Sequence, residues 1–284
     1  MKKLYLLIPI AILSWAFIMP RNTVPQLVVI GDSTASPYAA SDYPRMGWAQ
    51  VLQNYINKDS VIVVDKARSG RSSKSYYHEP EGWPAVQQIL QPGDFLFIQF
   101  GHNDAKMDDT TRFTDPFTTY KAYLKNYIDQ ARLMGVTPVL MTSIHRNEWE
   151  TDTMNIKDTH GNYLVATRQL AAEENVALID MANLTDSLFE AWGYKATTEQ
   201  IFLNLPPNLH YSYLSGNVDN THLQETGAYE LSKLVADELK AANDSSLASL
   251  KPAMYDMIKV PFAIEPPLGG AVQGARYFPI NKEK

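Results

Sequence analysis

Short apolar runs alternate along this chain with longer segments that have the periodicity of amphipathic helices. An unbroken apolar run predicts a strand buried on both faces, as in a parallel sheet that helices cover on each side. Strands that alternate with helices of this length are typical of βαβ units. The pattern therefore predicts an α/β domain, a three-layer α/β/α sandwich around a parallel sheet with strands at residues 27–30, 60–64, 95–100, 138–142 and 176–179. Helices are expected at residues 48–56, 82–90, 116–135, 164–174, 184–192 and 222–239.

Two segments break this alternation. Residues 193–218 contain Pro206-Pro207 and several aromatic residues without clear periodicity, which indicates a long loop. Long loops in compact domains are usually functional or mobile. Residues 243–284 are rich in Ser, Pro and Gly around apolar pieces, and we expect them to pack as an extension on a domain at residues 23–242.

The first 22 residues have the pattern of a secretory signal peptide. Lys2 and Lys3 precede an apolar run at residues 4–19, which is long for the hydrophobic part of such a peptide. No small-x-small cleavage site stands out, so an uncleaved N-terminal membrane anchor is the alternative. We expect export to the periplasm or the cell exterior, and we leave residues 1–22 out of the reasoning about the fold.

Composition excludes several classes of function. The net charge of −6 over 284 residues argues against nonspecific nucleic-acid binding, which needs a basic face to displace counterions from phosphates. The chain has no cysteine, which excludes a thiol nucleophile, a disulfide framework, a lipid-modified cysteine and any cysteine-ligated metal. The composition that remains is that of a globular domain with an ample core, since 45% of the residues of the chain are hydrophobic.

The first strand ends at Gly31-Asp32-Ser33. In open α/β sheets, ligands bind in the crevice outside the carboxyl ends of the strands. Ser33 is therefore a candidate nucleophile at that edge. The alternative is that Asp32 and Ser33 only cap the following helix.

The segment Asp219-Asn220-Thr221-His222 carries the second candidate. An Asp three residues before a His can accept the Nδ1 proton of its ring, which leaves Nε2 free as a base. Thr221 with Gln224 three residues later fits a capping box, which would place His222 in the first turn of a helix. The alternative is a histidine that only satisfies that helix terminus.

Gly70 and Asn103 follow the second and third strands and are candidates for an oxyanion hole. Gly70 can offer a backbone N–H at close range because it has no side chain, and Asn103 carries an uncharged amide donor. With the N–H of Ser33 they would make three donors. Each residue alone could be a turn former, but all these candidates fall on loops at the same predicted edge of one sheet.

The four sequence blocks resemble those of the SGNH (GDSL-type) hydrolases. The resemblance covers residues 27–240 and rests on Gly-Asp-Ser, the glycine after the second strand, Gly-x-Asn-Asp and Asp-x-x-His, in that order. Within this superfamily the chain is similar to the rhamnogalacturonan acetylesterases, carbohydrate esterase family 12. The similarity lies in Gly-Asp-Ser-Thr-Ala, Ser-Gly-Arg-Ser-Ser, Gly-His-Asn-Asp, His160-Gly-Asn-Tyr and Asp-Asn-Thr-His.

The resemblance implies a flavodoxin-like fold, no metal and no cofactor. It implies removal of acetyl groups from an acetylated plant cell-wall polysaccharide with a pectic backbone. Ser33 would be the nucleophile, His222 the base and Asp219 its orienting partner, with Ser33, Gly70 and Asn103 as oxyanion donors. The tail after residue 241 departs from the pattern and leaves the outer edge of the domain open.

Other functions remain as alternatives. An SGNH lipid or thioester esterase, or a xylan acetyl esterase, would share these blocks, because they specify acyl transfer and not the alcohol. A metallophosphoesterase would need Gly-Asn-His-Asp or Glu, an early Asp-x-His and a late Gly-His-x-His, none of which this sequence contains. A noncatalytic sugar-binding protein on the same scaffold is a further possibility, against which the complete set of Ser, Gly, Asn, Asp and His argues.

A pectic substrate is a polyanion, so an acidic protein would need local positive charge to bind it. The loops at the predicted edge carry Arg45, Arg68, Arg71, Lys74 and Arg146. A guanidinium can hold a carboxylate through two parallel hydrogen bonds, and we expect Arg71 to bind a uronate with Lys74 nearby. Aromatic residues available for stacking on a sugar are Trp83, Tyr76 and Tyr77. Alternatively, Arg68 and Arg71 pin their own loop through Asp32 or Asp65.

Overall fold

The computed structural model describes residues 24–151, 154–264 and 272–279. The predicted signal peptide at residues 1–22 lies outside the described residues, as do residues 265–271 and 280–284 of the predicted extension. Within the described ranges, no helix is both long and apolar enough to cross a membrane.

A parallel five-stranded sheet forms the middle layer, in the order β2-β1-β3-β4-β5. Val28 of β1 is paired on one side with Val64 of β2 and on the other with Leu96 of β3. This order, with its switch between β1 and β3, is that of flavodoxin-like folds. The predicted α/β sandwich is therefore confirmed, with strands β1 (Gln26–Gly31), β2 (Ile62–Asp65), β3 (Phe95–Gln99), β4 (Thr137–Met141) and β5 (Ala177–Ile179).

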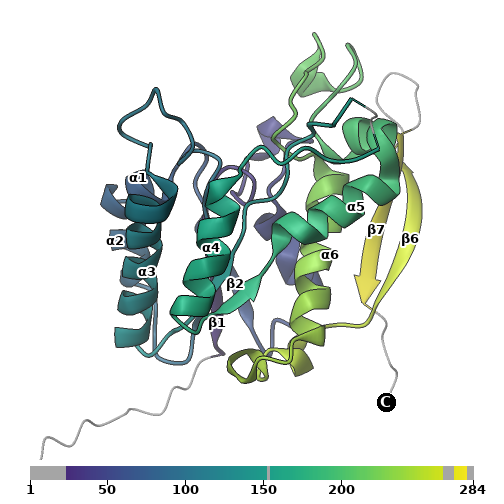
Figure 1. The fold of residues 1–284 in the computed structure, drawn as a ribbon. Helices are drawn as coiled ribbons and strands as arrows, with labels where there is room; N and C mark the ends of the chain where they lie inside the picture. Colours follow the sequence, from purple (N-terminus) through teal and green to yellow (C-terminus); the bar gives the residue numbers. More distant parts are fainter. Residues whose placement is uncertain (1–23, 152–153, 265–271, 280–284) are drawn as a thin grey trace, which may run out of the picture.

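Helices cover both faces of this sheet (Figure 1). One face carries α1 (Ser73–His78), α2 (Trp83–Gln87), α3 (Lys121–Leu133) and α4 (Asn162–Glu173). The other face carries the 3₁₀ helix η2 (Trp48–Tyr55), α5 (Met181–Ala196) and α6 (Glu225–Ala241). Shorter turns are η1 (Ala40–Asp42), η3 (Pro116–Tyr120), η4 (Thr197–Ile201), η5 (Tyr211–Tyr213), η6 (Ser245–Leu247) and η7 (Lys251–Ala253).

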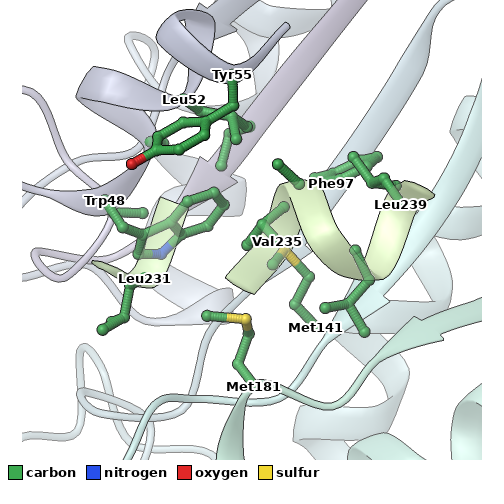
Figure 2. Close-up of a cluster of buried hydrophobic side chains, with 14 of the residues drawn as sticks. Trp48, Leu52, Tyr55, Phe97, Met141, Met181, Leu231, Val235 and Leu239 are labelled. Carbon is green, nitrogen blue, oxygen red and sulfur yellow. The ribbon is translucent and has the colours of Figure 1, made fainter. Parts of the chain in front are cut away.

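Alternate residues of each strand enter separate cores. Leu27 and Val29 pack toward η2, α5 and α6, whereas Val28 and Ile30 pack toward α1–α4. In the first core, Trp48 of η2, Leu231 of α6 and Phe97 of β3 belong to one cluster of buried side chains (Figure 2). Because β1, β3 and β4 are almost entirely buried on both faces, their sequences are largely apolar, which is the pattern that made the sheet predictable. The edge strand β2 is only partly buried, with Ile62 42% exposed.

The segments outside the alternation contain more regular structure than their sequences indicate. The predicted loop at 193–218 begins inside α5, which is kinked at Gly193 (φ 75°), and continues into η4. The predicted extension contains η6 and η7, and Leu247 of η6, Leu250 just before η7 and Ala253 of η7 are buried in the first core. An antiparallel hairpin of β6 (Met257–Ile264) and β7 (Val272–Pro279) follows, with β7 in contact with η2 and α6 (Figure 1).

Candidate active site

Ser33 lies on the turn that directly follows β1. Oδ1 of Asp32 accepts hydrogen bonds from the backbone N–H and the hydroxyl of Thr34, both at 2.9 Å, which fixes this turn. Asp32 is fully buried, and burial raises the pKa of its carboxyl. No helix begins at Ser33, since the next helical element starts at Ala40, so Asp32 shapes the turn that carries Ser33 and does not cap a helix.

Asp219 and His222 form a short, charge-assisted hydrogen bond of 2.6 Å between Oδ2 and Nδ1. Oδ1 of the same carboxylate accepts the backbone N–H groups of Thr221 and His222, both at 2.9 Å. Burial acts to raise the pKa of Asp219, but the hydrogen bonds from the His222 ring and from these two N–H groups outweigh it and lower the pKa to about 2. An ionised carboxylate only accepts, so the ring proton of His222 is on Nδ1 and the lone pair of Nε2 is free to act as a base.

The backbone around His222 differs from the predicted capping box. Helix α6 begins only at Glu225, with Gln224 as its N-cap residue, and Thr221 donates to Asp219 instead of capping that helix. Gln224 donates from its side chain to the carbonyls of Glu199 and Phe202. His222 therefore lies in the loop before α6, where its carbonyl accepts the N–H of Leu203.

Gly70 and Asn103 lie on neighbouring loops that are bonded to each other. The Asn103 side chain donates to the carbonyl of Arg71 at 3.0 Å, which leaves its second amide hydrogen for a ligand. Arg112 reaches the Gly70 carbonyl and the Asn103 side-chain oxygen, both at 3.5 Å. Gly70 has φ +79°, a conformation that favours glycine, and a Cβ there would meet nothing within 4 Å. Glycine is required here by backbone conformation and not by crowding.

Buried Asp104 ties these loops to the sheet edge. Its carboxylate accepts from the backbone N–H of Ser73 at 3.1 Å and from the Thr114 hydroxyl at 2.9 Å. Burial raises the pKa of Asp104 to about 7, against the hydrogen bonds from Ser73 and Thr114. The fourth residue of Gly-His-Asn-Asp thus holds together the loops that carry Gly70 and Asn103.

One cavity of about 330 Å³ brings together the predicted nucleophile, base, orienting residue and oxyanion donors. It opens at the carboxyl edge of the sheet, where the loops after β1, β2 and β3 meet the loop before α6. All of its described lining residues are polar, charged or glycine: Ser33, Arg45, Ser69, Gly70, His102, Asn103, Lys106, Arg146, Asp219, Thr221 and His222.

The three residues predicted to bind substrate do not line this cavity. Trp83 is 2% exposed and donates its indole N–H to Gln130 inside the second core, so it is not available to stack on a sugar. The ammonium group of Lys74 donates to the carbonyl of Thr110. Arg71 bonds both oxygens of Glu79 through Nε, at 3.0 and 2.8 Å, and the carbonyl of Ser69 through Nη1.

Arg71 therefore pins its own loop, but through a different partner from those considered in the sequence. Arg68 approaches the same Glu79 carboxylate at 3.6 Å. Tyr76 is fully buried, the ring of Tyr77 packs against Tyr123 and Tyr127, and neither residue lines the cavity. The helix register of α1 turns these side chains toward the layer of helices and away from the sheet edge.

Positive charge reaches the cavity from other loops. Arg45, Lys106 and Arg146 line it, and within the described ranges none of the three forms an ion pair with a carboxylate. The guanidinium of Arg45 lies 4.4 Å from the ring centre of Tyr38. Arg146 donates to the Thr159 hydroxyl at 2.8 Å. Arg45 and Arg146 were visible in the sequence as edge cations. His102 belongs to Gly-His-Asn-Asp but was given no role there, and no motif marked Lys106.

Comparison with known proteins agrees with this geometry. Residues 29–227 match the GDSL-like Lipase/Acylhydrolase family, and the chain belongs to that family. It is a serine carboxylic ester hydrolase of the SGNH type. The resemblance recognised in the sequence blocks is thereby confirmed.

Two curated relatives and a solved structure are similar over most of the chain. The rhamnogalacturonan acetylesterase RhgT of Bacillus subtilis is 37% identical over 215 residues, which cover 76% of this chain and 89% of that protein. The rhamnogalacturonan acetylesterase of Emericella nidulans is 30% identical over 252 residues, covering 81% and 90%. The crystal structure of the B. subtilis protein YxiM superposes with a TM-score of 0.65 at 24% identity, covering 79% of this chain and 58% of that one.

Proposed function

We propose that this protein removes acetyl groups from acetylated rhamnogalacturonan through a Ser-His-Asp acyl-enzyme mechanism. The observation that carries the proposal is the 2.6 Å contact between Asp219 and His222 in the cavity that Ser33 also lines. The similarity to the two rhamnogalacturonan acetylesterases supports the choice of substrate. A metal is not required for any step.

In this mechanism Nε2 of His222 takes the proton of the Ser33 hydroxyl as its oxygen attacks the acetyl carbonyl. The N–H groups of Ser33 and Gly70 and the amide of Asn103 stabilise the oxyanion that forms. His222 then gives its proton to the departing sugar oxygen, which leaves acetyl on Ser33. A water molecule activated by His222 attacks this ester and releases acetate, while Asp219 stabilises the imidazolium in both steps.

The polar cavity favours a short acyl group. A lipid or thioester esterase needs an apolar groove for the acyl chain, because burying a CH₂ group against apolar surface contributes about 0.8 kcal/mol. No described residue that lines this cavity has an aliphatic or aromatic hydrocarbon side chain. Acetyl has no methylene to bury, so it fits a cavity of this character better than a fatty acyl group does.

The cationic side chains that line the cavity support an anionic sugar chain as the substrate. Arg45, Lys106 and Arg146 make the cavity locally positive in a protein whose net charge is −6. A uronate next to the acetylated sugar would supply the missing carboxylate. A neutral xylan backbone would leave these charges without partners.

Acetate release from acetylated rhamnogalacturonan, acetylated xylan and a neutral aryl acetate tests the proposal. We expect the highest kcat/KM on rhamnogalacturonan. Equal or greater kcat/KM on xylan would contradict the substrate, and release from none of the three would contradict the acetylesterase activity itself.

The Lys106→Ala variant is expected to raise the KM for acetylated rhamnogalacturonan by about threefold to fivefold and to leave hydrolysis of the aryl acetate unchanged. The reason is that an exposed ion pair between Lys106 and a uronate would contribute up to about 1 kcal/mol to substrate binding. The difference should shrink at 1 M salt, where the Debye length falls to about 3 Å. Lys58→Ala is the matched control, because this exposed lysine precedes β2 at the opposite edge of the sheet. A KM unchanged by Lys106→Ala at low salt would remove this residue from substrate binding.

The Arg71→Ala variant is expected to lower kcat/KM by the same factor on the polysaccharide and on the aryl acetate. Its guanidinium holds the loop that carries Gly70 through Glu79 and the Ser69 carbonyl. Urea denaturation should show a free energy of unfolding lower by about 1 kcal/mol. A rise in KM confined to the polysaccharide would instead restore the role in uronate binding predicted from the sequence.

A further inference from the structure

Behind the catalytic cavity, three side chains that no motif connects converge. His145 follows β4, while Asp158 and His160 precede α4. One ligand atom from each of them lies within 4.8 Å of those of the other two. His145 and His160 are 6% and 4% exposed, whereas Asp158 is exposed and closes the cluster toward the surface.

Two ring nitrogens in this cluster have no hydrogen-bond partner among the described residues. They are Nδ1 of His145 and Nδ1 of His160, and both are buried. A buried polar atom without a partner costs about 1–3 kcal/mol, so two such atoms in one place call for a ligand. Burial lowers the pKa of both histidines, that of His160 to about 3, so both rings are neutral and can each offer a lone pair.

Neighbouring contacts determine which atoms can bind. Nε2 of His160 lies 3.1 Å from Nδ1 of His102, which leaves Nδ1 of His160 for a ligand. Oδ1 of Asp158 accepts the backbone N–H groups of His160 and Gly161, both at 2.8 Å. The carboxylate is thus held beside the His160 ring with its second oxygen available.

We propose that His145, Asp158 and His160 bind a divalent transition metal, with Zn²⁺ as the ion that best fits two imidazoles and one carboxylate. Three protein ligands leave a fourth tetrahedral position for water. Ligand atoms around Zn²⁺ lie about 3.3 Å apart, because Zn–N and Zn–O distances are about 2.0–2.2 Å. To reach this spacing from the present one, in which the three ligand atoms lie within 4.8 Å of one another, all three side chains would rotate inward on binding the ion. The resemblance seen in the sequence implied no metal, so this proposal departs from that expectation. It does not depend on the proposed esterase activity.

The charges around the cluster favour a cation on balance. Asp186 and Asp158 act on His145 as negative charges, and Arg168 acts as a positive one. The Arg168 charge is largely neutralised by its ion pair with Asp180, at 2.8 Å. Arg146 opposes a cation near His160, but it is held by Thr159 on the side of the catalytic cavity.

A metal here would also fix the tautomer of a residue in the catalytic cavity. With the metal on Nδ1 of His160, the ring proton is on Nε2 and is donated to Nδ1 of His102. His102 lines the cavity, and its own proton is then on Nε2. Two-bond ¹⁵N–¹H spectra of the zinc-loaded protein should show His102 protonated on Nε2, and protonation on Nδ1 would overturn this coupling.

Equilibrium dialysis of the full chain against ZnCl₂ after treatment with a chelator, with zinc counted by mass spectrometry, tests the site. We expect one zinc per chain, loss of that zinc in His145→Ala, and a Kd raised at least about tenfold in Asp158→Asn, since even outer partners of a metal site contribute that much. Asp158→Asn keeps an oxygen for the two backbone N–H groups, so it remains decisive if His145→Ala does not fold.

His78→Ala is the matched control, because His78 is exposed beside Tyr123, outside the cluster. It should bind zinc as the unaltered chain does. Stoichiometry near zero in the unaltered chain would overturn the proposal. So would zinc retained with unchanged Kd in Asp158→Asn, because the ion would then be bound elsewhere, for example at Asp219 and His222.

Discussion

The Ser33→Ala variant is expected to lose ester hydrolysis, with kcat falling by about 10⁴–10⁶-fold. Loss of one member of a catalytic triad leaves only the catalysis supplied by the oxyanion hole and by substrate binding. The turn that carries Ser33 is fixed by Asp32 and Thr34, so removing one hydroxyl leaves the turn in place. Acetate release from acetylated rhamnogalacturonan and hydrolysis of an aryl acetate measure the effect.

The Ser36→Ala variant is the matched control for this experiment. Ser36 lies three residues further along, is 4% exposed, and its hydroxyl donates to the carbonyl of Pro37 at 3.3 Å. Both variants should unfold at the temperature of the unaltered chain within about 2 °C, a shift that corresponds to about 0.5–1 kcal/mol for a domain of this size. Full activity in a folded Ser33→Ala protein would contradict the proposed mechanism with Ser33 as the nucleophile.

Removing the base His222 is expected to lower kcat more than removing its orienting partner Asp219. His222→Ala should lower kcat about as much as Ser33→Ala, because His222 is the base in the proposed mechanism, with its Nδ1 bonded to Asp219 and its Nε2 left to take the proton. Asp219→Ala leaves the imidazole and should be less damaging by one to two orders of magnitude, roughly as for the corresponding residues of subtilisin. Single-turnover measurements on an aryl acetate compare the two variants directly.

Asp219 also shapes its loop, so a second substitution separates its two roles. The carboxylate accepts the N–H groups of Thr221 and His222, and alanine removes both bonds together with the contact to the ring. Asp219→Asn retains an oxygen for the backbone and removes the charge. If kcat recovers fully in Asp219→Asn, the carboxylate charge does not assist His222. A folded Asp219→Ala protein less active than His222→Ala would reverse the two assignments.

The layers of the fold could be predicted because they depend on short-range pattern. A strand that helices cover on both faces is predominantly apolar, and residues 27–30 of β1 and 95–98 of β3 are unbroken apolar runs. Ser33, Gly70, Asn103, Asp219 and His222 could be assigned to one edge of the sheet because parallel strands end together. The order of the blocks was enough to recognise the family, which the comparisons confirm.

Tertiary structure decided which charged and aromatic side chains face the cavity. Arg71 follows Gly70 directly, yet it is bound to Glu79, and Trp83 is buried against Gln130, whereas Lys106 and Arg146 reach the cavity from the loops after β3 and β4. The capping box at Thr221 failed for a related reason, since the backbone N–H of Thr221 donates to Asp219 and the Gln224 side chain donates to the carbonyls of Glu199 and Phe202. The sequence by itself determined what is periodic and local. The partner of a long polar side chain depends on which loops the packed layers bring together, and no local pattern encodes that.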